Sequence, residues 1–323
     1  MKFGSVPGVD KPVSRLVHGA TGMAQYSDDL VYAGLDAATE IGCNTFDSAH
    51  IYFGGAHERA LGKWIRDNNM RDKVVILAKG AHHNSDRRRV TPFDIAADLH
   101  DTLARMQVDY VDLYVLHRDD ADVPVGPIVE ALNEHIRAGK IKAFGGSNWT
   151  HERVHEANVY AREHGLVPFA LSNPQLSLAT QVKEPWHNCV SIGGSDCDEA
   201  RDWYRREGLA VFAWSSIAGG FLSGNLTRMN IEEYKSKFGT LALESYGSEE
   251  NFQRLDRAYE LAEARNATVA QIALAWVLSQ PLNIFALVGA SSRDECQANA
   301  AALDIDLTEG EIAYLDLRVD TPE

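Results

Sequence analysis

Short apolar, β-branched or aromatic runs recur along the chain, and an amphipathic stretch follows most of them. The eight runs, which we expect to form strands, cover residues 16–23, 44–49, 74–80, 111–118, 142–148, 168–175, 209–216 and 284–291. Between them, apolar side chains fall three or four positions apart, as a core-facing helix requires. These helical stretches cover residues 28–42, 58–68, 94–107, 125–140, 152–165 and 198–208.

Strands that are apolar on both faces and are joined by helical crossovers form parallel sheets. Eight such units in 323 residues favour one α/β domain, a (β/α)8 TIM barrel over residues 1–323, over two doubly wound halves. No linker rich in Pro, Gly or Ser divides the chain. The alternation breaks at residues 217–250, a glycine-rich and polar stretch that reads as a long loop before helices at 251–280.

Two short helices are expected after the last strand, over residues 294–304 and 308–317. Thr308 and Glu311 stand three positions apart at the start of the second helix. This is the spacing of a capping box, in which each side chain satisfies a backbone N–H of the other residue.

Composition narrows the classes of function. The chain is 45% hydrophobic and 24% charged, which is typical of a globular protein. A net charge of −15 opposes a broad nucleic-acid interface, although a local basic cluster stands at residues 87–89. No apolar run approaches the roughly 20 residues that span a bilayer, and the first residues have no apolar signal core. We therefore expect a cytoplasmic protein with no nucleic-acid or membrane partner.

Metal chemistry is not indicated by the cysteines and histidines. The four cysteines are dispersed without a C-x-x-C pair, so we expect reduced thiols. The twelve histidines form no HExxH or other ligand spacing. The sequence therefore predicts no metal site.

Polar or functional side chains stand at the ends of six successive expected strands. They lie 27 to 39 residues apart, one strand-helix unit each, and are Asp47, Lys79, His117, Asn148, Gln175 and Trp214. In a barrel, the carboxyl ends of the strands meet at one face, where the active sites of this architecture lie. We therefore expect these side chains to share one mouth.

The types of these residues indicate proton transfer. Tyr52 follows Asp47 by five positions. A lysine ammonium beside a phenol favours the phenolate and lowers its pKa, and a carboxylate keeps that lysine charged and in place. Lys79 could serve this purpose, and His117 could donate a hydrogen bond or relay a proton. Considered alone, Asp47 would be interpreted as a helix cap and His117 as a hydrogen-bonded histidine of the core.

The chain resembles the aldo-keto reductase superfamily over nearly its whole length. The family's aspartate, its tyrosine five residues later and the following glycine match Asp47, Tyr52 and Gly54. Its strand-end lysine matches Lys79 in LAKG, and its strand-four histidine matches His117 in LYVLHR. The resemblance implies a catalytic tetrad of Asp47, Tyr52, Lys79 and His117.

The resemblance also implies a nicotinamide cofactor. The family's AGK-to-GSN segment matches residues 138–148, and in the family the residues at Ser147, Asn148 and Gln175 hold the nicotinamide carboxamide. An aromatic residue at the position of Trp214 stacks on the nicotinamide. The segment after it approaches the diphosphate, and the segment after strand eight grips the adenosine. The other implied contacts are Thr21, Gly22, Ser215, Leu222, Gly224, Ser291, Ser292, Arg293, Glu295 and Asn299.

The adenosine segment departs from the family pattern. Many members have a lysine and, six residues later, an arginine where this chain has Gly289 and Glu295. A carboxylate repels a 2′-phosphate but can accept a hydrogen bond from a free ribose hydroxyl. Ser292 and Arg293 remain as phosphate contacts, and the family prefers NADPH. We therefore expect NADP, with NAD as the alternative.

The activity implied by the resemblance is reduction of an aldehyde or ketone, with Tyr52 protonating the carbonyl oxygen. Two alternatives use the same residues. Some relatives are regulatory subunits that bind the cofactor and report redox state to a membrane partner. Others are dehydrogenases that oxidise a sugar or polyol.

The loops at the mouth carry aromatic, imidazole and charged side chains. Tryptophan faces flanked by hydrogen-bonding groups suit a polyhydroxylated ring, so we expect a carbonyl substrate derived from a sugar or polyol. The alternative is that half of these side chains are solvated loop residues. The candidates are His50, Phe53, His82, Arg118, Trp149 and Trp186.

Overall fold

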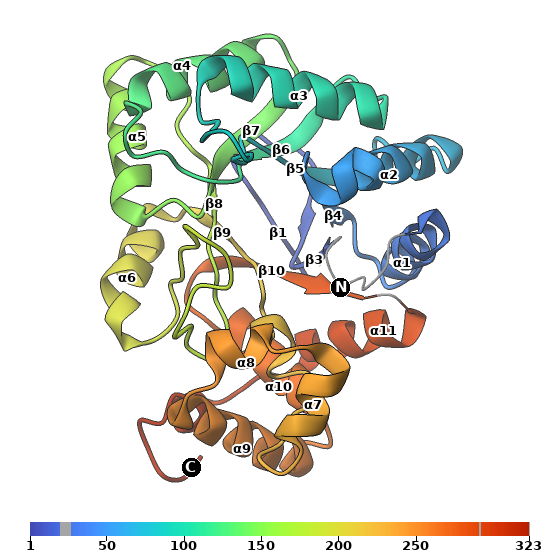
Figure 1. Ribbon diagram of the computed structural model, residues 1–323, viewed down its shortest axis with the longest axis vertical. Coiled ribbons are helices and arrows are strands. Elements are labelled where there is room, and N and C mark those ends of the chain that lie inside the picture. Colours follow the sequence, from blue (N-terminus) through green and yellow to red (C-terminus); the bar gives the residue numbers. More distant parts are fainter. Residues whose placement is uncertain (20–26, 291, 323) are drawn as a thin grey trace.

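Eight parallel strands close into a barrel in the order β10-β3-β4-β5-β6-β7-β8-β9. The structure is a computed structural model that describes residues 1–19, 27–290 and 292–322. Figure 1 looks along this barrel, with helices around it. The strands are β3 Leu16–Gly19, β4 Thr45–Asp47, β5 Val75–Gly80, β6 Val111–Leu116, β7 Ile141–Ser147, β8 Leu171–Asn173, β9 Ala210–Ala213 and β10 Asn283–Gly289. The predicted (β/α)8 barrel is confirmed.

The helices begin at polar capping residues in most cases. Thr91 and Thr150, for example, each accept a hydrogen bond from the backbone N–H three residues on, which satisfies a donor that the helix leaves unpaired. The α-helices of the described chain are α1 Asp28–Glu40, α2 Ala56–Asp67, α3 Pro92–Met106, α4 Val125–Arg137, α5 His151–Glu163, α6 Asp198–Glu207, α7 Ile231–Phe238, α8 Leu241–Tyr246, α9 Glu249–Ala264, α10 Val269–Leu278, α11 Arg293–Ala301 and α12 Glu309–Leu315.

The strands place alternate side chains in two separate apolar layers. On β5, Val75 and Leu77 point into the barrel, whereas Ile76 and Ala78 belong to the layer between the strands and the helices. This alternation is the two-residue period of a strand, and because both faces are covered, both sets are apolar. The barrel interior is therefore a packed core rather than a channel.

An antiparallel pair of two-residue strands precedes the barrel and was not predicted. In this hairpin, β1 (Phe3–Gly4) pairs with β2 (Val13–Ser14). Val6 and Val13 pack with the interior side chains of the barrel. Strands this short leave no periodic signal, because two residues cannot show alternation.

The predicted loop at 217–250 contains helices. A short 3-10 turn, η4 (Ala218–Gly220), comes first, and α7 and α8 follow. Tyr234 and Tyr246 are buried there, so the segment packs against the main core. The capping box of the last helix is confirmed, since Glu311 Oε2 accepts from Thr308 N at 2.8 Å and Thr308 Oγ1 accepts from Glu311 N at 3.1 Å.

Within the described residues, no helix combines the length and the apolar character that crossing a membrane requires.

Helix α2 packs tightly against the end of α3 at Gly62. A Cβ at this position would meet the backbone O of Met106, at the end of α3, at 2.1 Å, and such a contact forces the two helices apart. Both helices follow strands whose ends carry expected catalytic residues.

We therefore expect Gly62→Ala to destabilise the protein. Alanine gains about 1 kcal/mol of helix propensity, but overpacking against an immobile backbone costs about 1–3 kcal/mol beyond that gain. Urea unfolding should report the difference. Gly19→Ala is the matched control, because its Cβ would lie at an ordinary 3.5 Å from Val288 O. Equal stability of the two variants would contradict this account of the α2–α3 contact.

Candidate active site

A buried lysine stands at the centre of the candidate site. Lys79, on β5, forms an ion pair with Asp47 at the end of the neighbouring strand β4, and its Nζ donates a hydrogen bond to the Tyr52 hydroxyl at 3.1 Å. The Lys79 and Asp47 side chains are 2% and 3% exposed. Tyr52 is partly exposed, so its ring reaches from the barrel mouth to the buried ammonium. The structure brings three of the expected tetrad residues into direct contact.

The chain turns sharply after β4, and this turn positions Tyr52. The 3-10 turn η2 (Tyr52–Gly55) contains Phe53 and Gly54 with φ of 50° and 61°, in the left-handed region. His50 N donates to Lys79 O at 2.8 Å, which ties the turn to the next strand. The glycines lower the cost of a left-handed turn, because they lack a Cβ.

Burial and charge act in opposite directions on these groups. Burial disfavours the ammonium of Lys79, but Asp47 and Tyr52 outweigh this effect and hold its pKa above the ordinary value. Burial raises the pKa of Tyr52, and the opposing effect of Lys79 does not cancel the rise. Lys79 therefore lowers the pKa of the Tyr52 phenol as expected, but burial raises this pKa by more, so the net shift is upward. Tyr52 is a phenol at neutral pH.

His117 follows β6 and lies edge-on to Tyr52. Their ring centroids are 5.6 Å apart, and His82 packs against the other side of His117 at 4.9 Å. Burial, and after it the charges of Lys79 and Arg118, holds the pKa of His117 well below its usual range. The imidazole is therefore neutral. Its buried Nδ1 has no hydrogen-bond partner among the described residues.

The polar side chains at the ends of the next strands form a connected group. Asn148 has a left-handed backbone with φ of 58°, and its Oδ1 accepts hydrogen bonds from Trp214 Nε1 at 3.2 Å and Val190 N at 3.1 Å. Ser147 Oγ donates to Asn173 O at 3.1 Å. The amide and the indole are thereby fixed beside His117, whose backbone O accepts from Asn148 Nδ2 at 3.3 Å.

Both polar atoms of the Gln175 side-chain amide have hydrogen-bond partners within the chain, which the sequence did not indicate. Its Oε1 accepts from Ser191 Oγ at 2.6 Å, and its Nε2 donates to Ser177 Oγ at 2.8 Å. Trp214 is half-buried, and the ring of Trp186 lies 5.9 Å from it at a tilt. The indole of Trp214 is therefore near the surface of the mouth, whereas the amide of Gln175 is fully buried.

The residues expected at the far end of the cofactor differ in their surroundings. Ser215 and Gly224 have φ of 52° and 86°, and no atom of the described residues lies within 4 Å of a Cβ placed on Gly224. Leu222 is buried. Ser292 caps α11, and Asn299 donates to Gly289 O at 3.3 Å.

Arg293 and Glu295 are exposed, and Arg293 forms an ion pair with Glu40 of α1. Its guanidinium is thus drawn toward α1. The expected contacts Thr21, Gly22 and Ser291 lie outside the described residues.

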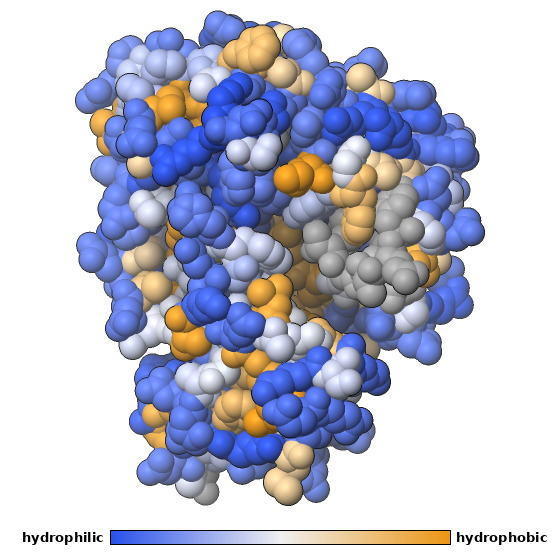
Figure 2. All heavy atoms as spheres, in the orientation of Figure 1, coloured by the Kyte–Doolittle hydropathy of each residue, from blue (hydrophilic) through white to orange (hydrophobic). Residues whose placement is uncertain are grey.

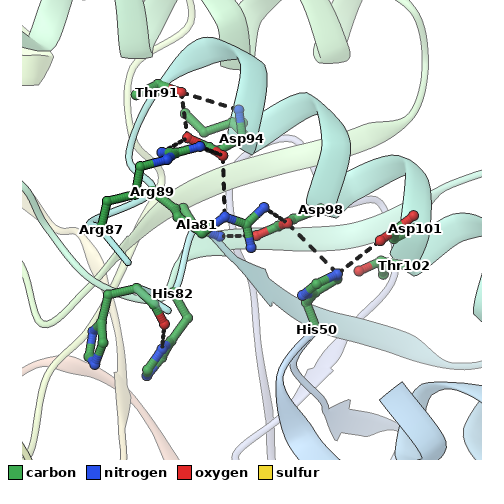
Figure 3. Close-up of polar contacts among 12 residues, drawn as sticks. His50, Ala81, His82, Arg87, Arg89, Thr91, Asp94, Asp98, Asp101 and Thr102 are labelled. Carbon is green, nitrogen blue, oxygen red and sulfur yellow. Dashed lines mark hydrogen bonds and ion pairs between the residues drawn. The ribbon is translucent and has the colours of Figure 1, made fainter. Parts of the chain in front are cut away.

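Two of the residues expected to bind substrate are directed elsewhere. Trp149 is 0% exposed and packs 5.2 Å from Phe169, so its ring has no free face for a ligand. The His50 ring lies 3.1 Å from an oxygen of Asp101 and is turned toward α3 (Figure 3). The sequence placed both residues in loops at the mouth, but burial and side-chain direction depend on tertiary contacts.

The other expected substrate residues lie near the mouth. Phe53 and Trp186 are exposed large apolar side chains. His82 is half-buried against His117, and burial lowers its pKa to about 4. Arg118, the residue after His117, is buried. Figure 2 shows the corresponding face hollowed near its centre.

An ionic network outside the expected set supports the loop after β5. Asp98 of α3 accepts from Ala81 N at 2.8 Å, and Ala81 has a left-handed φ of 59°. Arg89 binds both Asp98 and Asp94, and Arg87 binds Asp94 with two nitrogens. Figure 3 shows Asp94 between the two arginines. The basic cluster at 87–89 is therefore engaged in ion pairs.

The sequence held a signal for this network. Two acids four residues apart at the start of a helix follow three successive arginines. Burial alone would raise the pKa of Asp94, but hydrogen bonds from Arg87, Thr91 and Arg89 outweigh it and lower the pKa to about 2. The described residues contain no group of three or more His, Cys, Asp or Glu side chains that could hold a metal ion.

Several known proteins resemble this chain over most of its length. An "Uncharacterized oxidoreductase YrpG" from Bacillus subtilis (strain 168) is 26% identical over 308 residues, covering 91% of this chain and 89% of that protein. A "Probable voltage-gated potassium channel subunit beta" from Oryza sativa subsp. japonica is 28% identical over 306 residues, covering 91% and 88%. A "Norsolorinic acid reductase stcV" from Emericella nidulans is 27% identical over 323 residues, covering 91% and 73%.

A solved structure supports the fold. The crystal structure of the thermostable aldo-keto reductase Tm1743 with the inhibitor epalrestat gives a TM-score of 0.76 at 23% identity, over 99% of this chain and 100% of that one. The model of the Aldo/keto reductase family matches residues 15–318. Because this match spans nearly the whole chain, the protein belongs to the aldo/keto reductase family.

Proposed function

We propose that the protein reduces an aldehyde or ketone to the alcohol with NADPH, and that Tyr52 donates the proton. Family membership makes the chain an oxidoreductase that uses a nicotinamide cofactor. The observation that carries the proposal is the contact of Lys79 with both Asp47 and Tyr52 at the barrel mouth.

The described residues fit a nicotinamide dinucleotide. Trp214 offers a half-buried indole for stacking, and its N–H is fixed by Asn148. Open space over Gly224 permits close approach of a diphosphate to the backbone. When bound, the nicotinamide supplies the hydride that the protein itself cannot provide.

Each tetrad residue then has a role that its surroundings support. Tyr52, a phenol at neutral pH, gives its proton to the carbonyl oxygen as negative charge develops there. Lys79 stabilises the phenolate that remains, and Asp47 keeps Lys79 charged and in position. His117 is neutral and lies edge-on to Tyr52, so it is placed to orient the carbonyl or to relay the proton.

Tyr52→Phe should remove the proton donor and leave the cofactor contacts in place. We expect the turnover number to fall by at least ~10²-fold, the scale of losing a general acid, with little change in the dissociation constant of NADPH. Steady-state kinetics and fluorescence titration measure the two quantities. Lys79→Met should be comparably damaging.

The control for this experiment is Tyr160→Phe. Tyr160 is a phenol that bonds to Glu130 on the outer helices, so its loss should leave turnover near that of the wild type. Near-normal carbonyl reduction by Tyr52→Phe would overturn the assignment of the acid.

The pH dependence of reduction follows from the two pKa shifts. Tyr52 must be protonated to act as the acid, and its pKa is raised above the ordinary 10.0, so the phenol persists through the neutral and mildly alkaline range. His117 stays neutral because its pKa is lowered. We expect kcat/KM for reduction to be flat from about pH 6 to about pH 9.

An acid with an ordinary histidine pKa would behave differently. Activity would then fall about tenfold per pH unit above its pKa of ~6.5. Such a decline in stopped-flow or steady-state rates would shift the role of acid from Tyr52 to His117. In the oxidative direction the phenolate is the base, so the rate should instead rise with pH.

The preference for NADPH over NADH should depend on Glu295. Its carboxylate stands near the expected ribose segment, where it repels a 2′-phosphate. Glu295→Arg replaces repulsion by a possible charge-assisted hydrogen bond, so the NADPH/NADH ratio of kcat/KM should rise roughly tenfold or more. The rise should shrink with added salt, because the site is exposed. A ratio that does not move toward NADPH would mean that Glu295 points away from the ribose.

A second candidate function is regulatory. Relatives from Oryza sativa and Arabidopsis thaliana are named "Probable voltage-gated potassium channel subunit beta". A redox-reporting subunit would bind NADPH through the same residues and associate with a membrane partner. Absence of turnover on a panel of aldehydes, ketones and keto-sugars, together with copurification of a membrane protein, would favour this function. The contact of Lys79 with Tyr52 favours catalysis.

A further inference from the structure

Helices α2 and α3 are neighbours on the outside of the barrel, and side chains from both line an open cavity of about 590 Å³ (Figure 1). None of the residues that line this cavity belongs to the expected catalytic, cofactor or substrate residues. Its charged lining residues are Arg59, Lys63, Arg66, Asp101 and Arg105. Four cations and one carboxylate therefore line one cavity, in a chain whose net charge is −15.

A second cavity beside α2 provides a comparison. It measures about 470 Å³, and its charged lining residues are Arg66, Arg71, Asp72 and Asp109. Two acids thus balance two bases in this cavity. The excess of positive charge in the first cavity is therefore not a general property of this side of the barrel.

Three of the cations form one stripe along α2. Arg59, Lys63 and Arg66 follow one another at steps of four and three residues, which places them on one face of the helix. All three residues are exposed. Like charges at this spacing repel one another and weaken a helix. An anion bound between them would remove this repulsion.

Two of the four cations have carboxylate partners. Half-buried Arg105 pairs with buried Glu58 at 2.9 Å and lies 3.6 Å from a carboxylate oxygen of Asp101. Lys63 pairs with Asp67, one helical turn away on the exposed side of α2. An exposed ion pair of this kind contributes little to stability, so Lys63 can turn to a ligand, whereas Arg105 is held in place.

The guanidiniums of Arg59 and Arg66 are not neutralised in this way. Neither residue forms an ion pair with a carboxylate of the described chain, and Arg66 Nη1 donates to the backbone O of Met106 at 2.6 Å. The two arginines stand seven residues apart, which is roughly 10 Å along a helix axis. Both line the cavity. The long side chains of two arginines on adjacent turns can converge on one ligand between them.

The number and type of these groups indicate the class of ligand. A guanidinium offers a planar fork of N–H donors that matches the oxygens of a phosphate. Two such groups, with two positive charges, suit two linked anionic groups better than a single one. Gln107 supplies an amide donor at the α3 side of the cavity. Asp101 opposes an anion, but its carboxylate is drawn toward Arg105 and the His50 ring.

We propose that the cavity between α2 and α3 binds a small phosphorylated molecule through a diphosphate group, and that Arg59 and Arg66 bind its phosphate oxygens. Lys63 contributes a third positive charge from the same stripe. Because the lining residues are not those of the candidate active site, the proposal does not depend on the reductase function.

Calorimetric titration of the whole chain with pyrophosphate at low ionic strength tests the site. We expect saturable binding with a dissociation constant below about 1 mM. Added salt should weaken this binding, because the cavity is open to solvent. Arg59→Gln and Arg66→Gln should each weaken it roughly tenfold, the scale of a charge-assisted hydrogen bond. Absence of saturable binding to the wild type would overturn the proposal.

Asp101→Asn should improve binding. The substitution removes the carboxylate of the cavity and keeps the size of the side chain, so the affinity for pyrophosphate should rise severalfold. Damage to the fold does not produce such a gain. An affinity equal to or below that of the wild type would contradict a site that acts through charge.

Arg206→Gln is the matched control. Arg206 is an exposed arginine of α6 that forms no ion pair within the described chain and does not line the cavity. Its loss should leave the affinity for pyrophosphate unchanged. Equal weakening in Arg206→Gln and Arg59→Gln would show that general surface charge attracts the anion, and would overturn the site.

Further ligands identify the source of the diphosphate. ADP carries this group on a nucleoside, so tighter binding of ADP than of pyrophosphate would assign a nucleotide, and weaker binding would assign a diphosphate without a base. AMP has only one phosphate and should bind roughly tenfold more weakly than ADP. Equal affinities for AMP and ADP would refute the recognition of a diphosphate.

Competition separates this cavity from the cofactor site. NADP at a concentration that saturates the cofactor site should leave pyrophosphate binding unchanged. Displacement of pyrophosphate by NADP would place the anion in the cofactor site and overturn the proposal.

Circular dichroism and thermal melting establish that each variant is folded, which is expected because the substituted residues are all exposed. If Arg66→Gln disturbs the end of α3 through the loss of its bond to Met106, Arg59→Gln alone decides the outcome. Unchanged pyrophosphate affinity in a folded Arg59→Gln would refute the site.

Discussion

The site depends on one buried ammonium. Lys79 is withdrawn from water at the end of a barrel strand, and a lone charge in that position would be strongly destabilising. Asp47 on the neighbouring strand and the hydroxyl of Tyr52 compensate this cost, and in doing so they acquire fixed positions. The residues proposed to carry the chemistry are thus the same residues that make the buried charge tolerable.

The barrel makes this arrangement possible because its hydrogen bonds fix the register of β4 against β5. Asp47 lies opposite Leu77, two residues before Lys79, so both polar side chains are on the inward face at the mouth. Below them the interior is filled by apolar side chains such as Leu77 and Phe212. Water is excluded from the lower side of the ion pair, and only the mouth remains for a substrate.

Sequence reasoning predicted the parts of this site that follow from period and spacing. The strand ends at Asp47, Lys79 and His117 could be found because a strand and a helix of regular length separate them. The failures at Trp149 and His50 have a different origin. Their neighbours, Phe169 and Asp101, are brought close only by packing of separate units, and no local pattern records which way a ring turns.

Arg118 illustrates a further limit of sequence reasoning. Its type and position were evident, but its burial and the unpaired Nε appear only after every described neighbour has been placed. The hairpin β1–β2 was equally hidden, because two-residue strands are specified by their partner rather than by their own composition.

The support of Ala81 by Asp98 has a consequence for motion. The loop after β4 is tied to β5 through His50 N–H, and the loop after β5 is tied to α3 through Ala81 N–H. Hydrogen exchange of the Ala81 amide therefore requires local opening of its contact with α3, whereas exchange of the His50 amide requires its loop to part from β5. The proposed proton donor, Tyr52, thus stands on a loop whose opening is coupled to the strand that carries Lys79.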